Sequence, residues 1–196
     1  MITNPDTYQR IIESAKELIY SKSYADVGVA AICEKANVKK GSFYHFFPSK
    51  QELTLAVIDT YYTDFKNRII DRAFDSQLPP LERINLFCIM SIEMQCEIHQ
   101  QTGHVYGCPF GNLATELSTQ DETIRAKLDS QFAKLQNLFR AALQEAVDRG
   151  DAKNINVDAT ARAILAMFEG SMLLAKTHND PDILRQLLPP AAELRL

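Results

Sequence analysis

Residues 28–53 read GVAAICEKANVKKGSFYHFFPSKQEL, and this stretch decides the fold. Its apolar spacing predicts two short helices, at about 29–36 and 40–47, with a compact turn between them. Asn37 suits that turn, because asparagine tolerates a left-handed backbone better than most residues. The stretch therefore predicts two helices joined by a tight turn.

The flanking residues predict further helices on both sides of this pair. Upstream, Asn4 and Pro5 are typical of a helix start, and apolar residues then recur on one helical face to about Ser21. Downstream, Ser49 and Glu52 form a capping box for a helix that reaches about Phe74. Five apolar residues of the short helices are expected to pack against the first helix: Ile32, Ala36, Val38, Phe43 and Phe47.

Basic and polar residues gather where the second short helix begins. They are Lys39, Lys40, Gly41 and Ser42, followed by Tyr44 and, in the next helix, Lys50. A helix-turn-helix presents the N-terminal residues of its second helix to the major groove of DNA. Lysine contacts guanine or phosphate there, serine contacts either, and glycine lets the backbone approach closely. By spacing alone, a generic helical hairpin with lysines on a solvated face fits as well.

The segment resembles the signature of the TetR/AcrR family of one-component transcriptional repressors. The matching pattern is Val29-x-x-Ile32 … Ala36-Asn37-Val38-x-x-Gly41-Ser42-Phe43-Tyr44-His45-Phe46-Phe47-x-Ser49-Lys50-x-x-Leu53, preceded by the Arg10–Ile19 helix. The resemblance implies a homodimer that binds a palindromic operator, with one head on each half-site. It also implies that Lys40, Ser42 and Tyr44 face bases or nearby phosphates, and that Lys39, Tyr44 and Lys50 anchor the backbone.

Three positions depart from the family pattern. Gly28 stands where the family often has a Ser or Thr cap, and Ser23 stands where a glycine is usual between the first two helices. Phe46 replaces a frequent histidine, and His45 can partly take over its polar contact. More of the anchoring is therefore expected from the lysines and Tyr44.

The rest of the chain predicts an all-α fold of about nine helices. We expect a helix-turn-helix head at 1–47 and a ligand-binding and dimerisation body at 48–196. Further helices are expected at about 81–100, 112–117, 121–149 and 157–177, with an irregular connection at 101–111 and a short last helix that meets Pro189-Pro190.

Composition narrows the functional class. Net charge is −4, but residues 1–50 carry seven Lys or Arg and five Asp or Glu, so this head is at +2 and the remainder at −6. A mildly basic head on an acidic body suits local phosphate contact. No catalytic motif, cofactor signature, signal peptide or transmembrane run is found, so we expect a cytoplasmic protein that is not an enzyme and needs no cofactor or metal.

The body offers residues for a small-molecule effector site. The resemblance implies a pocket between the fourth and seventh helices, and an apolar lining is available: Tyr62, Phe65, Phe87, Met90, Met94, Phe110, Phe132, Phe139 and Phe168. Such residues at helical spacing also fit an ordinary core. If they line a cavity, its ligand is hydrophobic.

The segment at 106–113, YGCPFGNL, places Cys108 before a short helix. It resembles a Gly-Cys-Pro loop in a subset of the family, where the helix ends in an acidic residue, here Glu116. Cys108 is either a sensor for electrophiles or oxidants or a small packed thiol. A metal site involving His99, His104, Glu93, Cys96 and Glu97 is conceivable, but their spacing fits a solvated helix end better.

The 157–177 helix is apolar over more than half of its circumference, which fits either a dimer interface or a core helix within one chain. The expected interface residues are Ala161, Ile164, Leu165, Phe168, Met172 and Ala175. Together these features predict a repressor released from DNA by a small hydrophobic or thiol-reactive effector. A helical scaffold or partner-binding protein without specific DNA binding is the alternative.

Overall fold

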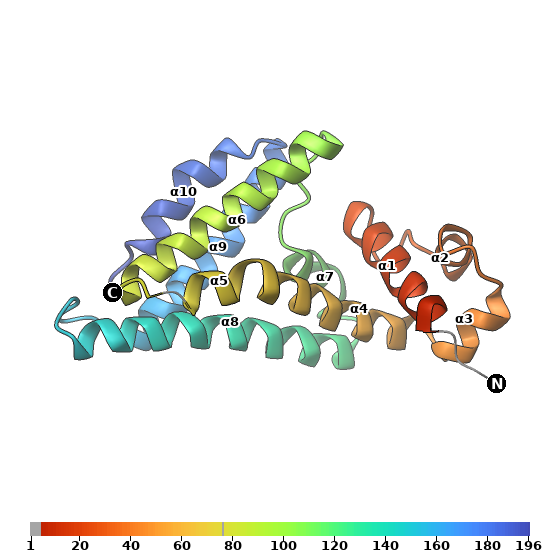
Figure 1. Ribbon diagram of the computed structural model, residues 1–196, viewed down its shortest axis with the longest axis horizontal. Coiled ribbons are helices and arrows are strands. Elements are labelled where there is room, and N and C mark those ends of the chain that lie inside the picture. The colour runs from red at the N-terminus through yellow and green to blue at the C-terminus, as the bar shows by residue number, and fades with distance from the viewer. Residues whose placement is uncertain (1–4, 76) are drawn as a thin grey trace. The chain divides into compact units, whose positions relative to one another are not determined.

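A computed structural model describes residues 5–75 and 77–196, and within them the chain is helical without a strand (Figure 1). The elements are α1 (Pro5–Ser21), α2 (Val29–Lys35), α3 (Lys40–Phe46), α4 (Lys50–Phe65), the π-helical turn η1 (Lys66–Ile70), α5 (Asp71–Phe74), α6 (Pro80–Thr102), α7 (Pro109–Leu117), α8 (Glu122–Asp148), α9 (Val157–His178) and α10 (Asp182–Ala192). With α4, η1 and α5 taken as one continuous helix, the described residues form nine helices. The all-α prediction is confirmed.

Two helix boundaries differ from the prediction. The connection before α7 ends earlier than expected, because Pro109 occupies the first helical position, where its missing N–H costs nothing. At the other end, α10 continues through Pro189 and Pro190 to Ala192, and the burial of Leu188 and Ala191 holds this last turn in place. The predicted cap at Asn4 lies outside the described residues.

The chain packs as two compact units, one formed by residues 1–64 and 109–129 and the other by 65–108 and 130–196. This grouping follows packing, whereas the expected division into a head at 1–47 and a body at 48–196 follows function. That functional division stays a prediction.

The first unit contains the helix-turn-helix. Its turn is a Schellman motif, in which the Val38 N–H donates to the Cys33 carbonyl at 2.9 Å and the Asn37 N–H to the Glu34 carbonyl at 3.0 Å. Asn37 has a φ of 52°, the left-handed conformation that the sequence predicted. Ser49 caps α4, because its Oγ accepts the Glu52 N–H at 3.1 Å.

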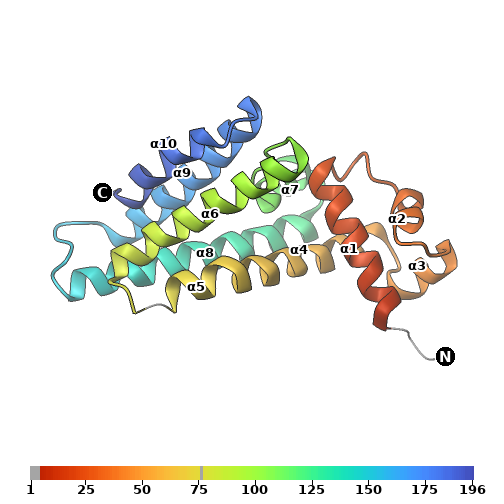
Figure 2. The same ribbon diagram turned by 45° about the horizontal axis from the view of Figure 1, so that its top comes forward.

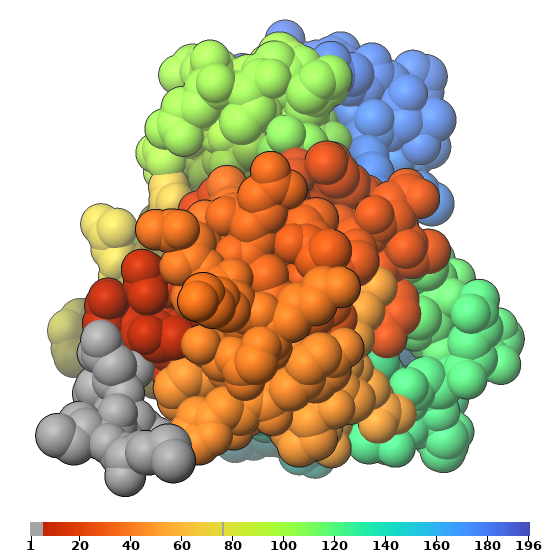
Figure 3. Space-filling view, turned by 90° about the vertical axis from the view of Figure 1, so that its right-hand side faces the viewer, coloured from red at the N-terminus to blue at the C-terminus, as the bar shows by residue number. Residues whose placement is uncertain are grey.

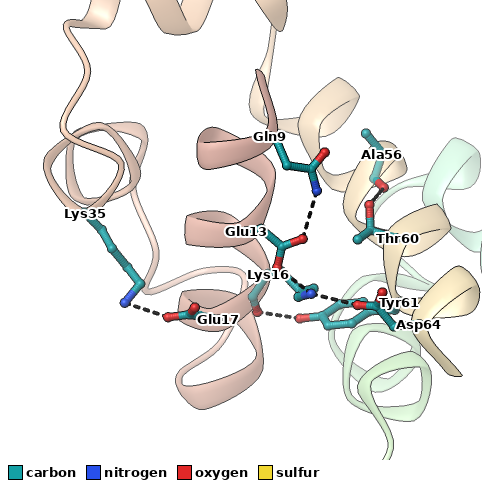
Figure 4. A network of polar contacts seen from close by, with 9 residues as sticks. All are labelled: Gln9, Glu13, Lys16, Glu17, Lys35, Ala56, Thr60, Tyr61 and Asp64. Carbon is teal, nitrogen blue, oxygen red and sulfur yellow. Dashed lines mark hydrogen bonds and ion pairs between the residues drawn. The ribbon is translucent and has the colours of Figure 1, made fainter. Parts of the chain in front are cut away.

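A shared apolar core and a polar network hold the helices of this unit together. The core is filled by fully buried side chains from four helices, among them Ile11, Ile32, Phe43 and Leu53. Figure 4 shows the polar network that joins α1 to α2 and α4. Its members are the ion pairs Lys16–Asp64 and Lys35–Glu17, both at 2.7 Å, and a 2.6 Å hydrogen bond from the Tyr61 hydroxyl to the Lys16 carbonyl.

In the second unit, α10 packs against both α6 and α9 (Figures 1 and 2). The core of this unit is a cluster of aromatic rings centred on Phe87. The centre of that ring lies 5.2 Å from the ring centres of both Phe139 of α8 and Phe168 of α9, and 5.7 Å from the ring centre of Phe65. Such edge-to-face and tilted ring pairs stabilise a core beyond the area they bury.

Candidate nucleic-acid interface and effector region

The N-terminal turn of α3 presents its polar residues to solvent. Lys39, Lys40, Gly41 and His45 are exposed, Ser42 is half-buried, and Tyr44 is 53% exposed although it follows the fully buried Phe43. Figure 3 looks onto the face of the head where α2 and α3, in orange tones, lie at the surface. The residues expected to contact DNA therefore stand on one accessible helix end.

The lysines of the head differ in what their ammonium groups contact. Lys16 and Lys35 are committed to carboxylates within the first unit. Lys39 and Lys40 form no ion pair with any residue that the structure describes. Their charges are therefore available for an external anion such as a phosphate.

Gly41 has no role in packing within the chain. Its φ is ordinary, and a Cβ built on it would meet no atom within 4 Å. Glycine in a helix costs roughly 0.5–1 kcal/mol relative to alanine, and no contact in the described residues offsets this. A close external contact explains such a residue, and DNA backbone is one.

Lys50 contacts the loop between α1 and α2. Its ammonium donates to the Tyr24 carbonyl and lies 3.8 Å from the centre of the Tyr24 ring, a cation–π contact. Burial lowers the pKa of Lys50, although Glu116 acts in the opposite direction. This side chain is used inside the head, so we do not count it among the proposed DNA contacts.

Glu116, at the end of α7, holds the loop between α1 and α2. Its carboxylate accepts the Tyr24 N–H at 2.9 Å and the Ala25 N–H at 2.7 Å. The backbone of Tyr24 is thus held on both sides: Glu116 accepts from its N–H, and Lys50 donates to its carbonyl. We call these three residues the loop clamp. Sequence analysis singled out Glu116 only as the acidic end of a short helix.

The structure separates the expected effector-site residues between the two units. Tyr62 and Phe110 lie in the first unit. There the ring of Phe110 packs edge-on against that of Tyr61, with ring centres 6.3 Å apart. The other expected residues lie in the second unit: Phe65, Phe87, Met90, Met94, Cys108, Phe132, Phe139 and Phe168. Phe87, Phe139 and Phe168 are buried in the ring cluster, as the core interpretation expected. The lining as a whole stays a prediction.

Cys108 is half-buried and lies against a carboxyl group. Its thiol is hydrogen-bonded to Glu169 of α9, and burial raises the pKa of that carboxyl to about 7, with the thiol acting in the opposite direction. Glu169 was missed by sequence analysis, although a signal existed: it is the one acidic residue in the apolar run from Ala163 to Ala175.

Most of the predicted dimer residues on α9 are buried within a single chain, and Leu165 is half-buried. Ala161, Ile164 and Ala175 are 0% exposed in a single chain, and Phe168 and Met172 are equally enclosed. These five side chains pack in the core of one chain, and the dimer interface stays a prediction. The large apolar residues that α9 exposes are Leu173, at 58%, and Leu174, at 46%.

Two further findings concern metals and membranes. In residues 5–75 and 77–196, no three His, Cys, Asp or Glu side chains gather as a metal site would require. None of the described helices combines the length and the apolar character that a membrane crossing needs.

Comparison with known proteins assigns the family. Residues 11–57 match Bacterial regulatory proteins, tetR family, and residues 80–189 match Tetracyclin repressor-like, C-terminal domain. The chain belongs to the TetR family. Members of this family are DNA-binding transcriptional regulators, typically repressors, rather than enzymes.

Individual relatives agree with this assignment over nearly the whole chain. Transcriptional regulator AcuR of Cereibacter sphaeroides is 36% identical over 177 residues, covering 89% of this chain and 78% of that protein. An uncharacterized HTH-type transcriptional regulator of Lactococcus lactis is 31% identical, covering 91% and 88%. The crystal structure of regulatory protein TetR from Rhodobacter sphaeroides superposes with a TM-score of 0.85 at 33% identity, over 97% of this chain and 99% of that one.

Proposed function

We propose that this TetR-family regulator is a repressor that binds a palindromic operator as a homodimer and leaves it when a small hydrophobic or thiol-reactive effector binds. The observation that carries the DNA contact is the start of α3. There, two consecutive exposed lysines, which form no ion pair with any described residue, directly precede Gly41, where a Cβ would meet no atom within 4 Å. Lys39, Lys40, Gly41, Ser42, Tyr44 and His45 form the proposed DNA surface.

Dimerisation in this proposal uses the outward face of α9. Leu173 and Leu174 are adjacent, large and apolar, and both remain exposed in the single chain. Large apolar groups at such exposure are candidates for burial against a second copy. Replacing Leu173 with Glu is expected to give a monomer in analytical ultracentrifugation, whereas a dimer of unchanged affinity would show that another face is used.

Release is proposed to be a population shift. An effector that prefers the non-binding arrangement biases α4, the helix that tethers the head, and the two heads leave the spacing of successive major grooves, roughly 34–36 Å. The loop clamp gives the head a second attachment, because Glu116 ties the α1–α2 loop to α7. Cys108 directly precedes α7 in sequence, so a modification there is well placed to act on this attachment.

The direct test uses DNA from immediately upstream of the regulator's own gene. We expect specific binding of a palindromic duplex, weakening steeply with salt because phosphate contacts release counterions. Absence of specific binding to any selected duplex would refute the repressor and leave the scaffold alternative.

Release by a thiol-reactive effector is tested by treating the protein–operator complex with N-ethylmaleimide. Treatment is expected to release wild-type protein and the Cys96→Ser variant, but not Cys108→Ser. Cys96 is the matched control, because it is the other partly exposed cysteine in the described residues. Equal release of Cys108→Ser would exclude Cys108 as the sensor.

A further inference from the structure

Cys108 and Glu169 bring a thiol and a carboxyl group together, and both residues are half-buried. Glu169 follows the buried Phe168 on α9 and is half-buried. Its Oε1 atom is buried and has no hydrogen-bond partner among the residues that the structure describes. Buried polar atoms are rarely left unpartnered, so this carboxyl calls for an explanation.

The loop before Cys108 is fixed from two helices, so the contact with Glu169 is not a chance rotamer of a mobile segment. Gln95 of α6 donates to the Gly107 carbonyl at 3.1 Å and accepts the Gly107 N–H at 3.3 Å. Asn179, which ends α9, accepts the Val105 N–H at 2.9 Å.

Gly107 brings the loop directly onto α9. It has a φ of 73°, and a Cβ there would lie 3.3 Å from the Met172 carbonyl and 3.5 Å from carbons of Lys176. Only glycine accommodates this conformation and this approach. The sulfur of the next residue is therefore held at a defined place beside Glu169.

A carboxyl beside a thiol has two opposite possible effects on reactivity. As a fixed negative charge it disfavours the thiolate and slows attack by sulfur. As a proton acceptor it removes the thiol proton during attack and speeds the reaction. Burial raises the pKa of Glu169 to about 7, so near neutral pH the group exists in both forms and can accept and return a proton.

We propose that Glu169 is the general base of a Cys108 modification site for electrophilic effectors of the α,β-unsaturated carbonyl class. This inference rests on the proposed thiol-reactive effector and assigns the residue that activates the thiol. The site consists of the Cys108 sulfur, the Glu169 carboxylate and the loop 103–108 that holds them together.

The reaction conserves atoms and electrons. The carboxylate of Glu169 takes the thiol proton as the sulfur lone pair forms a bond to the β-carbon of the electrophile. The π electrons of the C=C bond move toward the carbonyl oxygen, giving an enolate. The proton on Glu169 then passes to the α-carbon, so that S–H is added across the double bond and the carboxylate is regenerated. No oxidant or reductant is needed.

The other cysteines provide internal comparison. Cys33 and Cys88 are buried, and burial raises the pKa of the Cys88 thiol to about 12, which disfavours its reactive form. Cys96 is half-buried like Cys108, and its sulfur accepts a hydrogen bond from the Arg185 guanidinium at 3.3 Å. Its reaction with the same probe therefore reports general thiol chemistry without a carboxylate base.

The test is the rate of alkylation by N-ethylmaleimide in the absence of DNA, followed for each cysteine by peptide mass spectrometry. We expect Cys108 in wild-type protein to gain reactivity through an inflection near neutral pH, and Glu169→Gln to lower its rate by about tenfold or more. The Cys96 rate is expected to be the same in both proteins. Because DNA is absent, the result is independent of whether the chain proves to be a repressor.

A Cys108 rate that is unchanged or faster in Glu169→Gln would overturn the proposal, since a merely repelling carboxylate predicts acceleration. Circular dichroism checks that the variant is folded. If it is not, the wild-type pH profile alone decides: an inflection near neutral pH at Cys108 and not at Cys96 supports the base, and parallel profiles contradict it.

Discussion

Replacing Glu116 with alanine tests the loop clamp. The substitution removes the carboxylate that accepts the Tyr24 and Ala25 N–H groups at 2.9 and 2.7 Å, and it leaves the Lys50 side of the clamp in place. Hydrogen bonds to charged groups contribute about 1.5–3 kcal/mol each. The loop is partly solvated, so the lower end applies, giving about 1.5 kcal/mol for one bond and about 3 kcal/mol for both.

Amide hydrogen exchange measures this loss directly. Since each 1.4 kcal/mol is about a tenfold change in an equilibrium constant, exchange at Tyr24 and Ala25 is expected to accelerate between about 10- and 150-fold. Glu122→Ala is the matched control, because Glu122 is also a glutamate of the first unit but its ion pair is local, with Arg125 of the same helix. It should leave exchange in the α1–α2 loop unchanged.

Unchanged exchange at both amides in Glu116→Ala would refute the clamp, as would an equal effect of Glu122→Ala. The substitution also has an expected functional consequence. Without Glu116 the head has one attachment fewer, so N-ethylmaleimide treatment should release the variant from operator DNA less completely than it releases wild type.

Three further predictions concern single residues. Asn37→Ala should lower the free energy of unfolding by roughly 1–2 kcal/mol in urea titrations, because alanine is strained at a φ of 52°, whereas Asn37→Gly should be tolerated. Gly41→Ala should raise thermal stability slightly, since its Cβ meets nothing within 4 Å, and yet weaken operator binding; unimpaired binding would contradict close DNA approach. Burial raises the pKa of Glu169 from 4.5 to about 7, so the folded state loses stability as pH rises from about 4.5 to about 7, where the carboxyl is ionised in the unfolded chain but still protonated in the folded one. Wild type should therefore become less stable than Glu169→Gln by up to about 3 kcal/mol at high pH, with the difference vanishing below about pH 4.5; a pH-independent difference would contradict this assignment.

Local features of the head could be predicted because their causes are local. The left-handed turn at Asn37 and the cap at Ser49 depend on a few consecutive residues and on backbone preferences that sequence spacing reveals. The buried positions Ile32, Phe43 and Phe47 follow from helical periodicity for the same reason.

Features that depend on distant partners could not be predicted. Lys50 was expected to bind a phosphate, but Tyr24, 26 residues away, takes its ammonium. The apolar circumference of α9 indicated a second packing partner, but periodicity does not tell which face meets α6 and α10 and which stays exposed. The same limit hid Glu169, whose role depends on a loop about sixty residues earlier in the chain.

The central claim is that the start of α3 contacts DNA, and salt-dependent operator binding tests it most directly. The titration compares wild type, Lys40→Ala and Lys35→Ala, where Lys35 is the control lysine held by Glu17 at 2.7 Å. If Lys40 contacts phosphate, its loss should flatten the slope of log K against log salt by about 0.9 per half-site; if it reads a base, discrimination should fall by about 1–3 kcal/mol. Lys35→Ala should change neither quantity. If Lys40→Ala keeps the wild-type salt slope and sequence discrimination, or if Lys40→Ala and Lys35→Ala lose them equally, the start of α3 is not the DNA contact.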